Sequence, residues 1–202
     1  MHRTKRHPIG ELKLTKISDE FFELQAFPSF WQAKGMELHR SALVLANQFA
    51  ADSYALSQSV RDFEEGRIAE QPSFPTSVMS QFLLLAAFSI ENLFKGLVLF
   101  KEPGLVSAGR ITGIIKSHDL IALAARADVQ LTSDEQRFCQ LASSASIYWG
   151  RYPTSNSADS TLSSSTTSSA AFALFDQLAL RVSALYSERF HTRTRKPPRQ
   201  GG

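Results

Sequence analysis

The sequence predicts an all-α protein, a bundle of four to five helices that run up and down, with flexible basic ends. Apolar residues recur every three or four positions through several long stretches, which is the spacing of a buried helical face. Prolines, glycines and polar clusters separate these stretches, and no segment alternates apolar and polar residues as a half-buried strand does. The 202 residues, 43% of them hydrophobic, suffice for one domain with a substantial core.

The first two predicted helices are the longest. Apolar positions keep helical spacing without a proline from about residue 30 to 65, so this stretch is predicted to be one helix. It should end at Gly66 and the stretch 71–75, because proline cannot continue a helical hydrogen-bond ladder. The second helix should begin at residue 76 or 77, continue to about residue 101, and end before Pro103–Gly104. It is apolar on most of its circumference, which is typical of the centre of a bundle.

A short helix is predicted over residues 117–125. Ser117 is the expected N-cap, because a serine side chain can accept a hydrogen bond from a free N–H group at a helix start. His118 and Asp119 would then lie in the first turn.

A longer helix is predicted over residues 132–148. Thr132 and Glu135 have the spacing of a capping box, in which each side chain bonds the other residue's backbone N–H. Gly150 and Pro153 should end this helix.

The remainder divides into a loop, a last helix and the two ends. Residues 154–169 are mostly serine and threonine and are expected to form a loop, and a final helix is predicted over 170–189. The expected domains are a basic N-terminal segment over 1–25, the bundle over 26–190 and a basic disordered tail over 191–202.

Charge is distributed unevenly along the chain. Residues 1–16 hold five basic residues and one acid, and residues 189–202 hold five basic residues and no acid, although the whole chain has a net charge of only +3. The part between them is therefore acidic. Basic ends can hold nucleic acid by releasing counterions, or they can simply keep a protein in solution, and the sequence leaves both open.

Several classes of protein are disfavoured. The single cysteine, Cys139, allows neither an internal disulfide nor a cysteine-based zinc site, and it suits a buried position in a cytoplasmic protein. No cofactor or metal is expected, because His, Asp and Glu form no ligand pattern, and His39 and His191 are interpreted as solvent-facing. No membrane partner is expected, because Glu91 and Lys95 interrupt the most apolar segment.

Three polar motifs occur in a fixed order. They are Glu91–Lys95 (ENLFK) on the second helix, Ser117–Leu120 (SHDL) at a helix start, and Gly150–Pro153 (GRYP) after the fourth helix. In order and spacing they resemble the HEPN family of helical-bundle proteins, over roughly residues 30–190. The resemblance implies a HEPN-like bundle, a homodimer, and a link to RNA cleavage or to defence and toxin–antitoxin systems.

The resemblance also implies where chemistry would occur. HEPN nucleases carry an arginine followed four to six residues later by a histidine, and they use the ribose 2′-hydroxyl as nucleophile without a metal. Here Arg151 matches the arginine, but Asn156 and the next two residues are not histidine. An amide cannot accept a proton at neutral pH. We therefore expect a non-catalytic module that binds RNA, a nucleotide or a protein partner.

The expected ligand-binding residues are Lys95, Arg151, Tyr152 and Asn156. Lys95 has a second interpretation as the buried structural partner of Glu91, four residues away on the same helix.

One alternative is a weak metal-independent endoribonuclease with Arg151 and His118 as catalytic residues. In it His118 would be the base, beside the carboxylate of Asp119; the competing interpretation is that His118 and Asp119 are structural. Another alternative is a helical scaffold that only binds other proteins.

Overall fold

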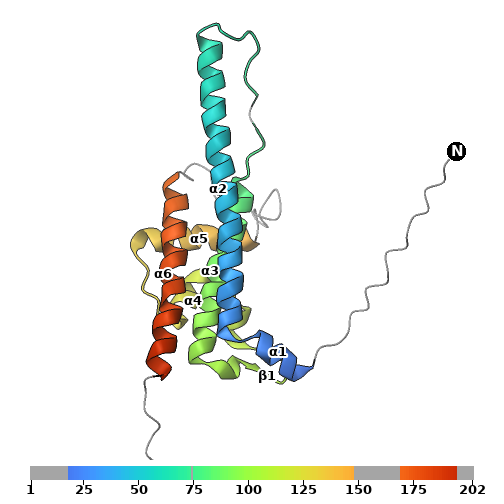
Figure 1. Cartoon of the computed structure of the whole chain (residues 1–202), viewed down its shortest axis with the longest axis vertical. Coiled ribbons are helices and arrows are strands. Elements are labelled where there is room, and N and C mark those ends of the chain that lie inside the picture. Colours follow the sequence, from blue (N-terminus) through green and yellow to red (C-terminus); the bar gives the residue numbers. More distant parts are fainter. Residues whose placement is uncertain (1–17, 74, 148–168, 195–202) are drawn as a thin grey trace, which may run out of the picture.

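A computed structural model describes residues 18–73, 75–147 and 169–194 of the chain (Figure 1). These residues form six α-helices, which confirms the all-α class. The helices are α1 (Asp19–Gln25), α2 (Pro28–Glu64), α3 (Met79–Lys101), α4 (Leu120–Arg126), α5 (Ser133–Ile147) and α6 (Ser169–Thr194). The stops expected at Gly150 and Pro153, the loop over 154–168, and residues 1–17 and 195–202 of the basic ends lie outside the described residues. Residues 19–25 of the expected N-terminal segment form α1, and residues 191–194 of the expected disordered tail instead continue α6.

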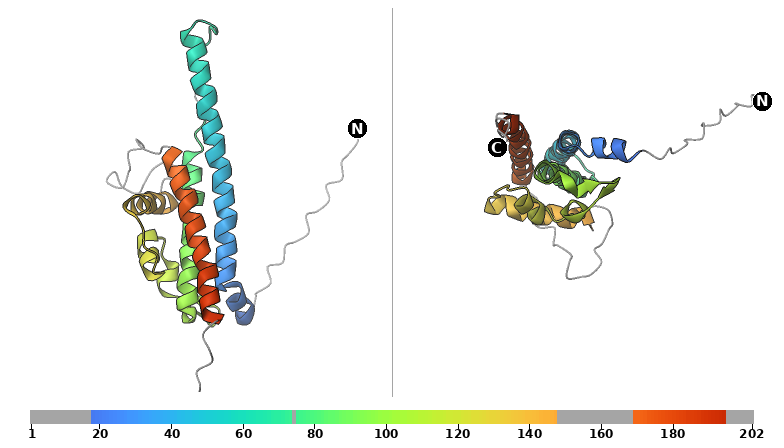
Figure 2. Two further views of the ribbon diagram at one scale, coloured as in Figure 1. Left: turned by 60° about the vertical axis from the view of Figure 1, so that its left-hand side comes forward. Right: turned by 90° about the horizontal axis from the view of Figure 1, so that it is seen from below.

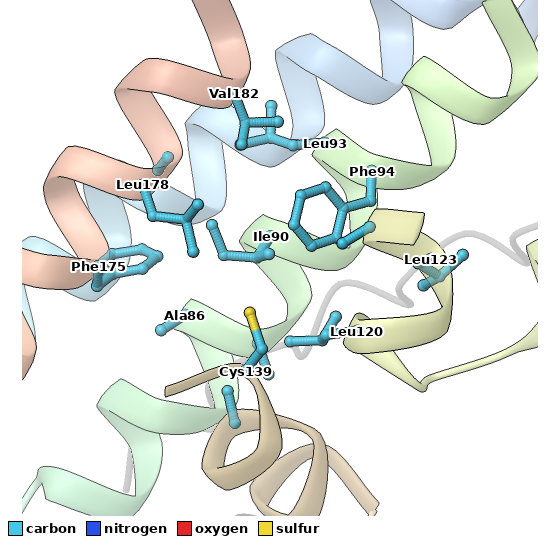
Figure 3. Packing of buried hydrophobic residues seen from close by; sticks show 14 of the residues in the cluster. Ala86, Ile90, Leu93, Phe94, Leu120, Leu123, Cys139, Phe175, Leu178 and Val182 are labelled. Carbon is cyan, nitrogen blue, oxygen red and sulfur yellow. The ribbon is translucent and has the colours of Figure 1, made fainter. Parts of the chain in front are cut away.

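Helix α3 is the centre of the bundle. Helices α2, α4, α5 and α6 all pack against it, and α2, α3 and α6 follow the long axis while α5 lies across them (Figures 1 and 2). Of the described helices, only α3 is long and apolar enough to cross a bilayer, and 78% of its most apolar window is buried inside the protein. Figure 3 shows side chains from α3, α4, α5 and α6 meeting in this core, among them Ile90, Phe94, Leu120, Cys139 and Phe175.

Small residues bring α2 close to α3. Gly35, Ala42 and Ala46 lie on the buried face of α2, and a Cβ atom at Gly35 would lie 2.8 Å from Cγ of Leu93. The hydroxyl of Ser89 on α3 donates a 2.8 Å hydrogen bond to the carbonyl of Gly35. Close backbone approach therefore explains why this part of the long helix contains a glycine, despite the entropic cost of glycine in a helix.

The ends of two helices follow the predicted chemistry. Pro28 occupies the first turn of α2, where its missing N–H is not needed, so the helix begins two residues before the predicted start. At α5, the Thr132 N–H donates to Glu135 Oε2 over 2.8 Å, and the Glu135 N–H donates to Thr132 Oγ1 over 3.2 Å. The capping box is therefore confirmed. Helix α6 continues past the predicted residue 189, and Phe190 packs edge-on against Phe100.

A short β-hairpin adds the one strand pair among the described residues. Strands β1 (Val106–Ser107) and β2 (Arg110–Ile111) are antiparallel, between the 3₁₀ turns η1 (Pro103–Leu105) and η2 (Gly113–Lys116). Ala108 and Gly109 have φ values of 49° and 67°, as the two central residues of a type I′ turn require. Two-residue strands are too short to give an alternating pattern, so the sequence did not indicate them.

The far half of α2 projects beyond the bundle, and the chain returns through residues 65–73 and 75–78 (Figures 1 and 2). We call residues 47–73 and 75–78 the distal arm. No described residue of the arm is buried, whereas Gly35, His39, Ala42 and Ala46 are buried in the near half of α2. Near its base, Phe49 of the arm packs edge-on against Phe172 of α6, with ring centroids 5.7 Å apart. Beyond that contact the arm is held mainly by its continuity with the packed half of the helix.

Candidate functional site

Glu91 and Lys95 lie on the core side of α3. Their side chains are 8% and 7% exposed, and Lys95 Nζ donates to Glu91 Oε1 over 2.7 Å. The helix places them one turn apart, as the four-residue spacing predicts. Because both groups are buried, each offsets the desolvation cost of the other. The structural interpretation of this pair is thus supported, and the ammonium of Lys95 points to Glu91 rather than to open solvent.

His118 is the second partner of Glu91. Its Nδ1 lies 2.8 Å from Glu91 Oε2, so one buried carboxylate holds a lysine and a histidine, one on each oxygen. His118 lies in the short connection between η2 and α4. The imidazole is 47% exposed, unlike the two groups beneath it. In the cluster Glu91–Lys95–His118, Glu91 and Lys95 are therefore buried, and the imidazole of His118 is the part that solvent reaches.

The capping of α4 differs from the prediction. Asp119, not Ser117, is the N-cap, and its Oδ1 accepts hydrogen bonds from the N–H groups of Ile121 and Ala122 at 3.0 and 3.1 Å. Ser117 instead accepts from the Asp119 N–H, at 3.0 Å. An aspartate caps as well as a serine, so the sequence alone did not distinguish Ser117 from Asp119 as the cap. Asp119 is thus structural, and the carboxylate that orients His118 is Glu91.

The geometry fixes the hydrogen-bonding roles of His118. A carboxylate can only accept hydrogen bonds, so Nδ1 of His118 carries a proton and donates to Glu91. In the neutral ring, Nε2 then keeps its lone pair and can accept a proton or a hydrogen bond. When the ring is protonated, Nε2 donates instead and the ring carries a positive charge. The same nitrogen can therefore interact with a hydroxyl or with a phosphate.

Helix α5 lies next to this corner of the bundle. The hydroxyl of Ser143, near the end of α5, accepts a 3.1 Å hydrogen bond from the N–H of Leu120, at the start of α4. Of the sequence-predicted site residues, the structure brings together Glu91, Lys95 and His118. Arg151, Tyr152 and Asn156, which follow α5 in the sequence, lie outside the described residues.

His39 is not solvent-facing, contrary to the sequence-based expectation. It is 6% exposed, its Nε2 lies 2.7 Å from Asp176 Oδ1, and its ring packs 5.3 Å from that of Phe175. The spacing of Gly35, His39, Ala42 and Ala46 follows one helical face, and this pattern could have revealed the buried position. His39 joins α2 to α6 through Asp176. It shares no partner with His118, which is bonded to Glu91.

Cys139 is buried, as expected, and is not a nucleophile. Burial, with a smaller contribution from the nearby Glu135 carboxylate, raises the pKa of this thiol to about 12. The reactive thiolate is therefore scarce at neutral pH. Among the residues that the structure describes, no group of three or more His, Cys, Asp or Glu side chains is arranged to hold a metal ion.

Glu135 has a role that the capping box alone did not indicate. Its Oε1 accepts a 2.7 Å hydrogen bond from Arg181 on α6, so it caps α5 and also ties α5 to α6. Burial acts to raise the pKa of this carboxyl, but hydrogen bonds from Thr132 and Arg181 outweigh it and lower the pKa overall. The 46 residues between the partners left no local signal for this contact.

No protein-family model, no curated protein and no solved structure matches this chain. The likeness to HEPN proteins thus remains a prediction that rests on the three ordered motifs, two of which the structure describes.

Proposed function

We propose that this chain is a non-catalytic, HEPN-like module that binds RNA or a nucleotide through a phosphate group. The observation that carries the proposal is the half-exposed imidazole of His118, fixed from below by the buried carboxylate of Glu91. A surface group whose orientation is already fixed loses little entropy when it binds a ligand. In this proposal the module acts as a cytoplasmic homodimer in a defence or toxin–antitoxin setting, with Arg151, Tyr152 and Asn156 completing the ligand patch.

Two features favour binding without cleavage. Lys95 is bonded to Glu91 and buried, so it is not placed to stabilise charge on a phosphate at the surface. The sequence also lacks a histidine four to six residues after Arg151. Loss of a general base or acid typically lowers a rate by about 10²–10⁴-fold.

The test is the affinity for a labelled single-stranded RNA, measured by fluorescence anisotropy at low salt. We expect His118→Ala and Arg151→Ala each to weaken binding by about fivefold or more, because each removes a phosphate-facing group. His191→Ala is the matched control, since it removes an exposed histidine from α6. Unchanged affinity in both site variants, with circular dichroism showing that they are folded, would refute the proposed patch.

The orientation of His118 also favours a second candidate, the metal-independent endoribonuclease. Because Nδ1 is bonded to Glu91, Nε2 is the nitrogen available to take a proton from a ribose 2′-hydroxyl. The 2′-oxygen would form a bond to the adjacent phosphorus while the P–O5′ bond breaks, which leaves a 2′,3′-cyclic phosphate and a 5′-hydroxyl that takes its proton from water or from the protonated imidazole. Cleavage of RNA in the presence of EDTA, lost in both His118→Ala and Arg151→Ala, would establish this activity in place of binding alone.

The third candidate, a scaffold that binds only a protein, gives a different result in the same assay. It predicts no retention of RNA even at low salt. Retention that depends only on the basic residues of 191–202 would instead indicate a non-specific electrostatic contact.

A further inference from the structure

One end of the bundle carries a cluster of exposed apolar side chains. Phe21, Leu24, Phe27 and Phe30 are 47%, 59%, 51% and 54% exposed, and they lie within ten consecutive residues of α1 and the start of α2. We call these four residues the basal patch. Single exposed apolar residues are ordinary, but a cluster of large ones marks a surface that contacts something else.

An apolar pocket continues the basal patch into the bundle. Its volume is about 220 Å³, and its mostly apolar lining includes Phe27 of the patch with Leu99, Phe100, Val106 and Phe190, and one charged residue, Glu23 of α1. These residues come from α2, the end of α3, β1 and the end of α6, so four elements close on one opening. The pocket can accept an apolar side chain or the end of an acyl chain.

Two of the three acids of α1, Asp19 and Glu23, lie on the side of the helix that faces the hairpin, and Glu23 also lines the pocket. Glu23 Oε1 accepts a 2.8 Å hydrogen bond from the Ala108 N–H of the hairpin, and a Cβ atom at Gly109 would meet the Asp19 carboxylate. Since residues advance by about 100° around a helix, Phe21 and Leu24 lie on the side away from these two acids. Of the three α1 acids, only Glu20 is close to the apolar side.

Both basic ends of the chain join the bundle at this same end. Helix α1 follows the basic residues 1–16, and α6 ends at the base and is followed by Arg195, Lys196 and Arg199 (Figure 1). The distal arm, at the opposite end, has five acids and two bases among its residues. Because both basic segments are attached at this end and the acidic arm lies at the other, the base is the end that a negatively charged surface would attract.

We propose that the basal patch docks on an anionic lipid bilayer, with the basic ends beside it. Stable attachment to a bilayer surface takes two signals, apolar insertion and a polybasic segment, and both occur at this end. A second copy of the chain is a weaker fit. Four large side chains, each about half exposed, offer roughly 400 Å², whereas a stable interface buries about 800 Å² per partner.

RNA is the competing ligand for this end, because three of the four patch side chains are aromatic and the basic ends could hold the phosphates of either ligand. The pocket beside the patch favours lipid, because its mostly apolar lining can accept the end of an acyl chain. Lys34 and Lys101, the lysines nearest the patch and pocket in sequence, are paired with Glu37 and Asp128. The proposal is independent of the ligand patch at His118. It also departs from the sequence-based expectation of no membrane partner.

The apolar half of the proposal is tested by sedimentation of the full chain with phosphatidylcholine vesicles, with and without phosphatidylserine. Phe21→Ser with Leu24→Ser should lower partitioning to the anionic vesicles by about tenfold or more, from the apolar area removed. Val44→Ser with Tyr54→Ser is the matched control, because these exposed residues lie on α2 away from the base. The control should change partitioning by less than about twofold. Equal effects of the two variants would refute the basal patch.

The charge half is tested with Arg195→Gln, Lys196→Gln and Arg199→Gln in one chain. Each cation near an anionic surface contributes about 1 kcal/mol, so partitioning should fall by tenfold or more, and added salt should have the same effect on the unaltered chain. Equal binding to vesicles without phosphatidylserine would refute the proposal. So would a patch variant that loses dimerisation or RNA retention while its vesicle binding is unchanged.

Discussion

At the scale of single residues, Glu91 organises the candidate site, because its two oxygens hold Lys95 and His118. The pair with Lys95 could be predicted, since helix geometry alone brings residues four apart together. The bond to His118 could not, because it spans 27 residues and depends on how α4 packs on α3. His39 shows the same limit, since its partner Asp176 is on a helix far away in sequence.

Glu91→Gln should destabilise the protein by about 3–5 kcal/mol, because it leaves the Lys95 ammonium buried without a counter-charge. Adding Lys95→Met should recover a large part of this loss, since the apolar chain remains and the charge is removed. Urea unfolding of the two single variants and the double variant measures the coupling. Additive effects would show that the two side chains do not share a buried contact.

Glu135 predicts a pH dependence of stability. Its folded-state pKa is below the usual value of 4.5, so its contribution is complete at pH values above the unfolded pKa and is lost as the pH falls through the folded pKa. Glu135→Gln should therefore cost about 1.5–3 kcal/mol at pH 7, the range for a hydrogen bond with a charged group. The difference from the unaltered chain should shrink below about pH 4.5. A difference that stays constant down to acid pH would contradict this role.

At the scale of elements, helix ends could be predicted from the sequence where a proline, a glycine or a capping pair marked them. Prolines, glycines and the Thr132–Glu135 box gave the limits of α2, α3 and α5 to within a few residues. The β-hairpin could not be predicted from the sequence. The two turn residues with positive φ are Ala108 and Gly109, and this pair is a weaker hairpin signal than Asn-Gly. Nor did the sequence choose between Ser117 and Asp119 as cap, because both side chains suit that position.

Gly96 tests the packing of α2 against α3. Alanine normally stabilises a helix interior by about 1 kcal/mol relative to glycine. Here an added Cβ would lie 2.8 Å from Cβ of Trp31 and 3.0 Å from the carbonyl oxygen of Pro28, and it would also meet the Tyr186 hydroxyl. Gly96→Ala should therefore lower the free energy of unfolding by about 1–3 kcal/mol. Urea unfolding should show this as a lower midpoint.

Gly104→Ala is the matched control, because no atom lies within 4 Å of its added Cβ. It should change stability by less than about 0.5 kcal/mol. A Gly96→Ala variant as stable as this control would mean that the helices do not approach as closely as described.

At the scale of the whole molecule, α3 is the shared partner of four helices, and the distal arm stands outside this core. The apolar character of α3 around most of its circumference predicted its central place. The arm was less predictable, because α2 keeps helical spacing along its length and a helical repeat does not say where its partners end. Where the arm begins is visible only from the lack of buried residues between Ala46 and Phe82.

Amide hydrogen exchange should divide α2 into two halves. The near half, with Gly35 and Ala42 buried, should be protected up to the global free energy of unfolding, because it opens only when the bundle does. Amides after Ala46 should exchange at least tenfold faster, since local fraying suffices to open them. Uniform protection to Glu64 would show that the arm has a stabilising contact beyond those described.

The central claim is that Glu91 fixes His118 so that Nε2 is the ligand-facing nitrogen. Nitrogen-15 NMR of the imidazole tests it directly, in the free protein and on addition of a short single-stranded RNA. We predict a protonated Nδ1 and an unprotonated Nε2 in the neutral ring, with the Nε2 resonance shifting as RNA is added and Glu91→Gln abolishing the preference for one tautomer. A neutral ring protonated at Nε2, or resonances that do not respond to RNA, would contradict the claim.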